Sequence, residues 1–153
     1  MLCSRRFAAL LAAALSGAST AGGPGGALLQ PLGPGYEGCG CSVEAHDLER
    51  GRLQSQLLFQ DLAEVPATTV RVDGAHLPLQ PLDGELFVEW GAPLGTPVAA
   101  SFAMPGGRVE FEGKVTRTCY GQESCEAVWY EGSLTAILGG RRESRPLSAG
   151  CGC

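Results

Sequence analysis

Residues 108–120 read RVEFEGKVTRTCY, and residues 126–138, beyond a short polar loop, read EAVWYEGSLTAIL. In both stretches apolar and polar side chains alternate, which is the period of a strand that buries one face and exposes the other. The residues expected on the buried faces are Val109, Phe111, Val115 and Cys119 in the first stretch, and Val128, Tyr130, Leu134, Ala136 and Leu138 in the second. The two stretches therefore predict neighbouring strands of an antiparallel sheet.

The same period of two recurs along the rest of the chain. It predicts further strands at residues 54–60, 67–80, 85–90, 96–104 and 141–147. Asp73-Gly74 supplies the residue types that a tight hairpin turn needs at positive φ. Pro78 removes one backbone donor from the returning strand, which favours an edge position for that strand.

The turns and the short strands together indicate the fold class. About seven or eight strands separated by Gly/Pro turns, without long helical periodicity, are typical of an all-β domain. The sequence therefore predicts a small antiparallel β-sandwich or β-barrel, stapled by disulfides.

The first 21 residues have the composition of a secretory signal peptide. Arg5 and Arg6 precede an apolar run at residues 7–15, and small residues suited to cleavage follow at 16–21. The apolar run is too short for a spanning helix, and no cysteine follows it closely enough for a lipid anchor. We therefore expect an extracytoplasmic protein, secreted or periplasmic, with no membrane span and no lipid anchor.

Two segments are expected to lie outside the sheet. Residues 22–38 (GGPGGALLQPLGPGYEG) are rich in Gly and Pro and predict a flexible tether. Residues 42–52 (SVEAHDLERGR) are charged and predict one short helical turn with Ser42 as its cap. The single β-rich domain is expected to span residues 39–153.

Apart from Cys3 in the predicted signal, the cysteines are Cys39, Cys41, Cys119, Cys125, Cys151 and Cys153. An even number in an exported chain is typical of a disulfide framework, and six cysteines allow 15 pairings. Cys119 and Cys125 flank the polar loop between two strong strands, so we expect them to form a hairpin bridge. Pairing within a Cys-Gly-Cys triplet would close a strained ring, so cross-pairing of the two triplets is favoured, with other pairings left open. Each cross-pair would close a loop of roughly 110 residues.

The two triplets also permit an alternative function. Thiolates from Cys39, Cys41, Cys151 and Cys153 are suitable ligands for Zn²⁺ or Cu⁺, and a Cys-Gly-Cys pair can shuttle between dithiol and disulfide. Export to an oxidising compartment favours bridges over thiolates, and zinc sites more usually space their ligands as Cys-X-X-Cys. We therefore expect no cofactor, with a thiol-based metal or redox protein as the alternative.

Charge argues against two classes of partner. Without Arg5 and Arg6 the chain carries 9 basic and 16 acidic side chains, a formal charge of −7. Nucleic acids and anionic membranes both require clustered Lys and Arg, so neither is expected as a partner. Lys114 is the only lysine, whereas Arg, Gly, Ala and Leu are abundant, which is typical of a GC-rich bacterial genome.

The sequence shows no assembled catalytic group. His46 and His76 are the only histidines, and no Gly-X-Ser-X-Gly motif supplies a nucleophile for a serine hydrolase. Glu110 and Glu112 point the same way on one predicted strand, as a glycosidase pair would, but basic residues interleave with them. We therefore assign no catalytic residue and expect a non-enzymatic protein.

Three aromatic residues near the polar loop are candidate ligand contacts: Tyr120, Trp129 and Tyr130. Trp129 falls on the face opposite Val128 and Tyr130, so a one-sided sheet would place its indole outside, where it can stack on a sugar or seat a peptide. In a closed sandwich the same indole would be core. The predicted function is an exported β module with a binding, inhibitory or structural role, whose partner is a protein, a peptide or a glycan.

Overall fold

The computed structural model describes residues 26–46, 56–62, 67–82, 91–119 and 126–153. Within these ranges the chain contains no helix, and its strands are β1 (Leu29–Gln30), β2 (Gly40–Ala45), β3 (Gln56–Asp61), β4 (Thr68–Val72), β5 (Ala75–Pro81), β6 (Pro97–Met104), β7 (Gly107–Thr118), β8 (Ala127–Leu138) and β9 (Arg141–Gly152). The predicted signal peptide, the predicted strand at 85–90, Tyr120 and Cys125 lie outside the described residues.

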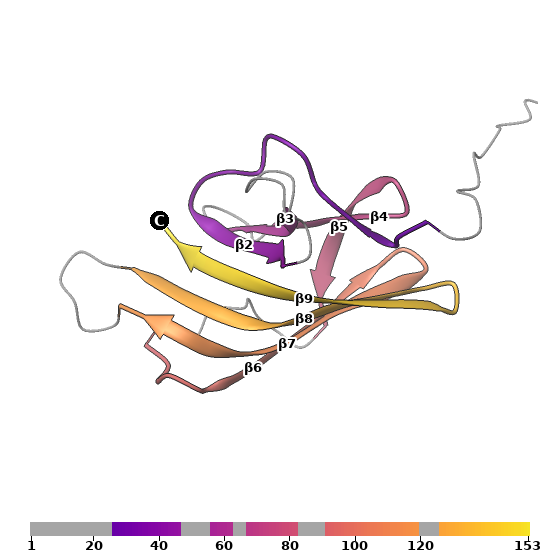
Figure 1. Cartoon of the computed structure of the whole chain (residues 1–153). Helices are drawn as coiled ribbons and strands as arrows, with labels where there is room; N and C mark the ends of the chain where they lie inside the picture. The colour runs from indigo at the N-terminus through magenta and orange to yellow at the C-terminus, as the bar shows by residue number, and fades with distance from the viewer. Residues whose placement is uncertain (1–25, 47–55, 63–66, 83–90, 120–125) are drawn as a thin grey trace, which may run out of the picture.

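Strands β2 to β9 close into an eight-stranded antiparallel barrel (Figure 1). Each strand pairs with its neighbour in sequence, and β9 returns to pair with β2. This closure joins the two outer edges that an open meander would leave, which is how up-and-down barrels avoid edge-to-edge association. Of the two architectures that the sequence predicts, the barrel is the one that forms.

Two-residue turns connect the best-defined hairpins. Asp73 (φ 50°) and Gly74 (φ 88°) join β4 to β5, and Gly139 (φ 56°) and Gly140 (φ 81°) join β8 to β9. Positive φ at both central residues gives the turn whose twist matches that of the flanking strands. The hairpin predicted at Asp73-Gly74 is confirmed.

Strand β5 is the most weakly paired strand of the barrel. Pro78 lies opposite Thr69 of β4, whereas β5 pairs with β6 only at Gln80 and Pro81. Pro78 itself therefore has a paired neighbour on one side alone, but β5 pairs with β4 and with β6 in the closed barrel, so the predicted edge position of this strand is wrong. The barrel closes around this point through the short β5–β6 contact.

The barrel interior is packed with apolar side chains that come from each of its strands. Tyr130, Phe102 and Phe111 are the largest fully buried residues, and the rings of Phe111 and Tyr130 meet edge to face at 6.3 Å. The buried faces predicted for β7 and β8 are confirmed for Val109, Phe111, Val115, Val128, Tyr130, Leu134 and Ala136. Side chains just fill an eight-stranded barrel, so its centre is a hydrophobic core.

A bulge in β7 changes one predicted face. The register of β7 against β8 shifts after Val115, so that Arg117 pairs with Trp129 and Thr116 is an extra residue. One extra residue reverses the inward and outward alternation of everything that follows it. Cys119 is buried but lies outside the core cluster, so the prediction that it shares the face of Val115 is wrong.

The helical turn predicted at residues 42–52 is wrong for its described part. Ser42 to Ala45 belong to β2, where Val43 and Ala45 are buried and Ser42 and Glu44 are half-buried. Pairing with β3 on one side and β9 on the other decides the conformation here. Tertiary pairing of this kind overrides a weak local helix signal.

The flexible tether predicted at residues 22–38 is also wrong for its described part. Leu28, Leu29 and Leu32 are each no more than 3% exposed, and β1 pairs with β4 opposite Arg71 and Val72. Leucines scattered through a Gly/Pro-rich segment are enough to anchor it, because each buries apolar area against the barrel. The segment is a packed extension of the fold.

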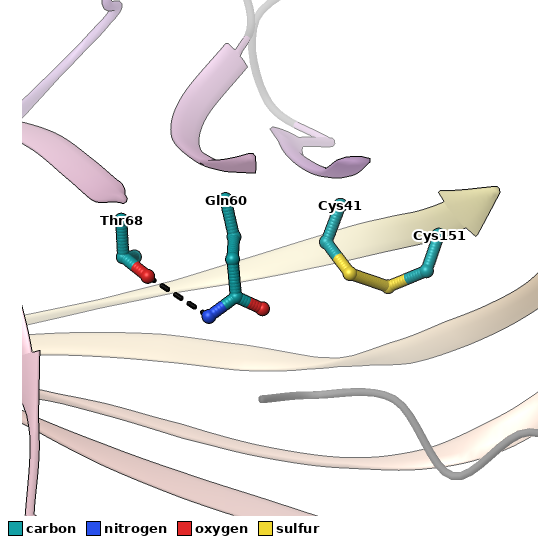
Figure 2. The surroundings of a disulfide bond; sticks show 4 residues. All are labelled: Cys41, Gln60, Thr68 and Cys151. Atoms are coloured by element: carbon teal, nitrogen blue, oxygen red, sulfur yellow. Dashed lines mark hydrogen bonds between the residues drawn. A yellow bond between two sulfur atoms is a disulfide. The ribbon is translucent and has the colours of Figure 1, made fainter. Parts of the chain in front are cut away.

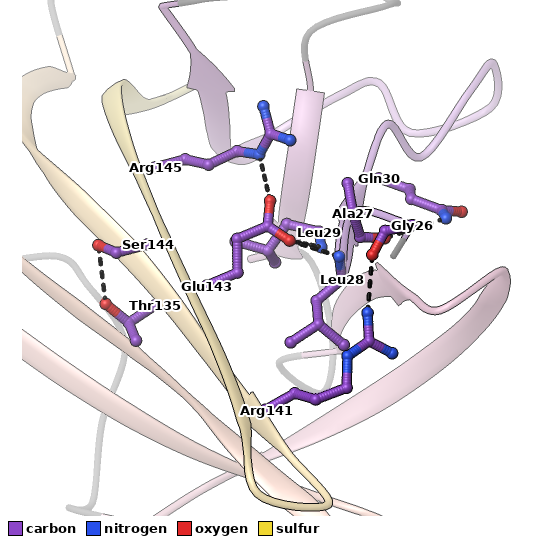
Figure 3. Close-up of polar contacts among 10 residues, drawn as sticks. All are labelled: Gly26, Ala27, Leu28, Leu29, Gln30, Thr135, Arg141, Glu143, Ser144 and Arg145. Atoms are coloured by element: carbon purple, nitrogen blue, oxygen red, sulfur yellow. Dashed lines mark hydrogen bonds and ion pairs between the residues drawn. The ribbon is translucent and has the colours of Figure 1, made fainter. Parts of the chain in front are cut away.

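Glu143 fixes this extension to the barrel (Figure 3). Its carboxylate accepts a hydrogen bond from the backbone N–H of Leu28, and Arg145 donates to the same carboxylate at 2.7 Å. Arg141 donates to the carbonyl oxygen of Gly26 at 2.7 Å. Charge-assisted bonds from one strand of the barrel therefore satisfy backbone groups of the N-terminal segment.

Two disulfides cross the seam where β2 meets β9. Cys41 bridges Cys151 and Cys39 bridges Cys153, with Cα–Cα separations of 4.0 and 4.2 Å. Cys41 and Cys151 are directly opposed in register and are buried in the core, whereas Cys39 and Cys153 are exposed. The predicted cross-pairing of the two triplets is confirmed, and it locks the closure of the barrel.

The two bridges stabilise the fold redundantly. They close loops of 114 and 110 residues, and one such bridge contributes about 4–5 kcal/mol on the chain-entropy model. Once either bridge is formed, the other closes only a few further residues. We predict that replacing Cys39 and Cys153 by Ser costs about 2 kcal/mol or less, whereas replacing all four cysteines costs at least about 5 kcal/mol.

Urea denaturation of the oxidised variants measures both values. Equal losses for the exposed pair alone and for all four cysteines would contradict redundancy, because one bridge would then carry the whole effect.

A polar pair lies in the core beside the buried disulfide (Figure 2). Gln60 pairs in register with Cys41 on one side and with Thr68 on the other, and Gln60 is fully buried. Its amide nitrogen donates to the Thr68 hydroxyl at 2.8 Å, while its carbonyl oxygen has no hydrogen-bond partner in the described part of the chain. Burying an unpaired acceptor is costly, so the pair is a weak point of the core.

We predict that Thr68→Val destabilises the protein by about 1–3 kcal/mol, because the buried amide then loses its partner. Adding Gln60→Met, which replaces the amide by an apolar side chain of similar size, should return the stability to within about 1 kcal/mol of the parent or above it. Urea unfolding of the two single variants and the double variant measures the coupling. A double variant less stable than Thr68→Val alone would contradict the prediction.

Candidate functional site

The two Cys-Gly-Cys triplets have an inner side and an outer side. Because successive residues of a strand point to opposite faces, Cys41 and Cys151 point into the core while Gly40 and Gly152 face outward. Gly40 pairs directly with Gly152 across the seam. Cys41 and Cys151 therefore bridge the two strands from inside the barrel, and the glycines add no side chain to its outer surface.

One cross-strand row explains the shape of this outer surface. Trp129 of β8 pairs with Gly150 of β9, Gly150 pairs with Ser42 of β2, and Ser42 pairs with Phe59 of β3. Two large aromatic residues thus flank two small ones. Neighbouring strands lie about 4.8 Å apart, so the backbones of the two aromatic residues are separated by roughly 14 Å across three strand spacings.

The next cross-strand row also contains only small residues. Ala127, Gly152 and Gly40 pair in sequence across the same three strands. Together the two rows form a groove of about 480 Å³ on the outer face of β8, β9, β2 and β3, which we call the outer groove. This volume lies within the range of small-molecule sites.

Trp129 forms one wall of the outer groove. The guanidinium of Arg117 lies 4.4 Å from the indole centroid and covers one ring face by a cation–π contact. The Cδ1–Nε1 edge leans over Gly150, within 3.3 Å of where a β-carbon would be on that glycine. Arg117 itself does not line the groove.

Phe59 and Tyr36 form the opposite wall. Their ring centroids lie 6.3 Å apart, and Phe59 leans over Gly40, where a β-carbon would come within 2.7 Å of its ring. Behind Tyr36 the ring of His76 stacks at 5.8 Å, and His76 Nε2 is held 2.8 Å from the carbonyl oxygen of Leu32. The N-terminal extension therefore supplies one of the aromatic walls.

Gln56 is the most deeply buried polar residue of the outer groove. It is only 4% exposed, and its amide nitrogen donates to the Tyr36 carbonyl oxygen at 3.2 Å and to the Ser42 hydroxyl at 3.0 Å. Both amide hydrogens are used, whereas the carbonyl oxygen makes no hydrogen bond within the described ranges. Gln56 therefore brings to the groove lining an acceptor that no described protein group uses.

Charge in the outer groove is negative. The exposed carboxylate of Glu37 lines it, and among the described lining residues there is no Lys, Arg or His. A ligand anion would find no counter-charge there. The groove therefore suits a ligand that is neutral or positively charged.

The structure distributes the predicted ligand contacts differently from the sequence pattern. Trp129 lines the outer groove, whereas Tyr130 is fully buried inside the barrel and does not reach solvent. Tyr120 lies outside the described residues. The sequence reasoning did not identify Tyr36, Phe59 or Gln56, because only the register of β2 against β3 and the path of the N-terminal extension bring them together.

The remaining predicted residues are accounted for as follows. Cys119 is disulfide-bonded, and its Sγ lies 3.3 Å from the Ala127 carbonyl oxygen. Its expected partner, Cys125, is outside the described residues, so that bridge stays a prediction. His46 is exposed, and Glu110 is ion-paired with Arg108 at 2.6 Å.

The thiol alternative meets a chemical obstacle. The four sulfurs of the triplets, Cys39, Cys41, Cys151 and Cys153, are paired in disulfides and therefore present no thiolate to Zn²⁺ or Cu⁺. In the ranges that the structure describes, no three His, Cys, Asp or Glu side chains are grouped to hold a metal ion. Metal binding through these residues would require prior reduction of both bridges.

Comparison with known proteins provides no relative: no family model matches the chain, nor does any curated protein or solved structure. Across the described ranges, no helix is long and apolar enough to cross a bilayer. Any functional argument therefore rests on the chemistry of the outer groove.

The glycines of the groove differ in how much room they have for a side chain. A β-carbon on Gly40 would collide with the backbone carbonyl oxygen of Gln60 as well as the Phe59 ring, whereas one on Gly150 would meet only the indole of Trp129. We predict that Gly40→Ala destabilises the protein by about 1–3 kcal/mol and that Gly150→Ala costs less than about 1 kcal/mol. Thermal unfolding of the two oxidised variants compares them, and equal losses would contradict the packing described.

Proposed function

We propose that this protein is an extracytoplasmic, non-enzymatic binding module that holds a small ligand in the outer groove. The observation that carries the proposal is the row Trp129–Gly150–Ser42–Phe59, in which two aromatic walls flank a floor of small residues. Aromatic walls with a few placed polar groups are the usual composition of a ligand site.

The position of the groove supports binding by a preformed site. Its floor is the β2–β9 seam, where Cys41–Cys151 and Cys39–Cys153 fix the two strands directly beneath the glycines. Sites built on rigid strands lose little conformational entropy when a ligand binds. The barrel therefore acts as the scaffold and the seam as the support of the site.

The polar groups of the groove support binding over catalysis. Ser42 is the one hydroxyl of the floor, and its oxygen accepts from Gln56 and lies 3.4 Å from a Glu44 carboxylate oxygen. No imidazole lines the described groove to activate this hydroxyl as a nucleophile. Binding needs none of these activating groups.

Disulfides are consistent with an oxidising, extracytoplasmic location. The signal-like residues at the N-terminus support secretion or a periplasmic location, and the arginine-rich composition supports a bacterial source. A rigid disulfide-locked barrel suits such a compartment, where chaperones and reductants are scarce.

Fragment screening by amide and indole NMR of the oxidised protein tests the proposal. We predict that small aromatic and polyhydroxylated fragments shift the Trp129 indole N–H and the amides of Gly150 and Gly152. Trp129→Ala should weaken the same fragments at least about tenfold, since it removes one wall, which is about 1.4 kcal/mol of binding free energy. Glu112→Gln, at an exposed position of β7, serves as the matched control and should leave binding unchanged. Fragments that shift only amides away from the seam would refute the proposal.

A further inference from the structure

The groups that line the outer groove restrict its ligand more narrowly than shape alone. Resting on the function proposed above, we infer that the ligand is a neutral saccharide, bound with a sugar ring against Trp129 and a hydroxyl at Gln56. Three features of the described residues lead to this class: the unused acceptor, the charge of the lining and the aromatic walls.

The unused acceptor requires a ligand that donates hydrogen bonds. The Gln56 carbonyl oxygen belongs to a side chain that is 4% exposed, and both of its amide hydrogens are already bound by protein acceptors. A ligand that excludes water without donating to this oxygen would leave it unsatisfied, at a cost of about 1–3 kcal/mol. Sugar hydroxyls both donate and accept, so they match Gln56 as well as the Trp129 indole N–H.

The charge of the lining disfavours ligand anions, and the unused acceptor disfavours quaternary ammonium ligands. Glu37 is the charged side chain of the described lining and would repel phosphate, sulfate and uronate groups, while the nearby guanidinium of Arg117 lies against the indole and does not line the groove. A quaternary ammonium would suit aromatic rings and a carboxylate, but it has no hydrogen to give the Gln56 acceptor. It would also face Arg117, which already places one cation 4.4 Å from the same indole.

The aromatic walls suit a ring with apolar faces. The indole of Trp129 is half-buried and lines the groove, while Arg117 covers one of its ring faces from outside the lining. A pyranose has C–H groups on its faces and hydroxyls around its rim, so it can contact the indole and reach Gln56 together. Ser42 and the glycines between the walls carry no bulky side chain, but the indole of Trp129 leans over Gly150 and the ring of Phe59 leans over Gly40, so the open floor is narrower than the row of small residues.

The inference is tested with the oxidised full chain on an array of neutral oligosaccharides: gluco-, galacto-, manno-, xylo- and N-acetylglucosamine-based. Hits are then measured by titration calorimetry, alongside tetramethylammonium and a sulfated disaccharide as charged probes. We expect at least one neutral oligosaccharide to bind, with affinity reduced at least about tenfold by Gln56→Leu and by Trp129→Ala. Glu112→Gln should bind as the parent does, and circular dichroism melting checks that each variant folds.

The outcomes separate the ligand class from the binding function. If tetramethylammonium or the sulfated probe binds in a Trp129-dependent manner and no neutral oligosaccharide does, the saccharide inference is overturned while the groove remains a binding site. Absence of neutral oligosaccharide binding, with fragments still mapping to the groove, has the same meaning. If a neutral oligosaccharide binds but Trp129→Ala does not change its affinity, both the inference and the proposed function are wrong. Because Trp129 is only half-buried, this variant decides the matter even if Gln56→Leu fails to fold.

Discussion

The pairing of β2 with β9 is the interaction on which the rest of the structure depends. Every other pair in the barrel joins strands that are consecutive in sequence, so local hairpins account for them. The β2–β9 pair instead joins residues 40–45 to residues 147–152 and must overcome the entropy of closing most of the chain. The two disulfides at this seam offset the entropic cost of closure, because they restrict the conformations of the unfolded chain.

The same seam also creates the candidate site. A Cys-Gly-Cys triplet in a strand necessarily sends its cysteines to one face and its glycine to the other. Inside the barrel the cysteines bond to each other, and outside it Gly40 and Gly152 leave a floor that Trp129 and Phe59 enclose. The buried disulfide and the candidate binding surface thus lie on opposite faces of the same two strands, because successive residues of a strand point to opposite faces.

Much of the fold follows from local pattern. The period of two in β7 and β8 predicts their buried faces, and Asp73-Gly74 predicts its hairpin, because these signals act over a few residues. The cross-pairing of the triplets also follows, since a bridge within a triplet is strained. The bulge at Thr116 does not follow, because one inserted residue leaves the alternation on each side intact and only pairing reveals the shift.

What the sequence could not provide is the partner of each strand. From sequence alone residues 42–45 resemble a charged, weakly helical segment, but in the barrel they form a strand between β3 and β9. Leu28 lies in a Gly/Pro-rich segment that predicts a tether, but in the structure it is buried against the barrel. The groove depends on the same information. Trp129 stands out by its face, but Phe59, Tyr36 and Gln56 join it only through register and through the path of the N-terminal extension.

Disulfide mapping tests the closure of the barrel most directly. Cleavage of the oxidised protein with trypsin separates the segment that ends at Arg50 from the segment that begins at Glu143 unless bridges join them. The structure predicts that these two segments remain covalently linked, and that mild reduction opens the exposed Cys39–Cys153 bridge before the buried Cys41–Cys151 bridge. Release of the two segments from each other without reductant, or a bridge from either triplet to Cys119, would contradict the seam and with it the site built upon it.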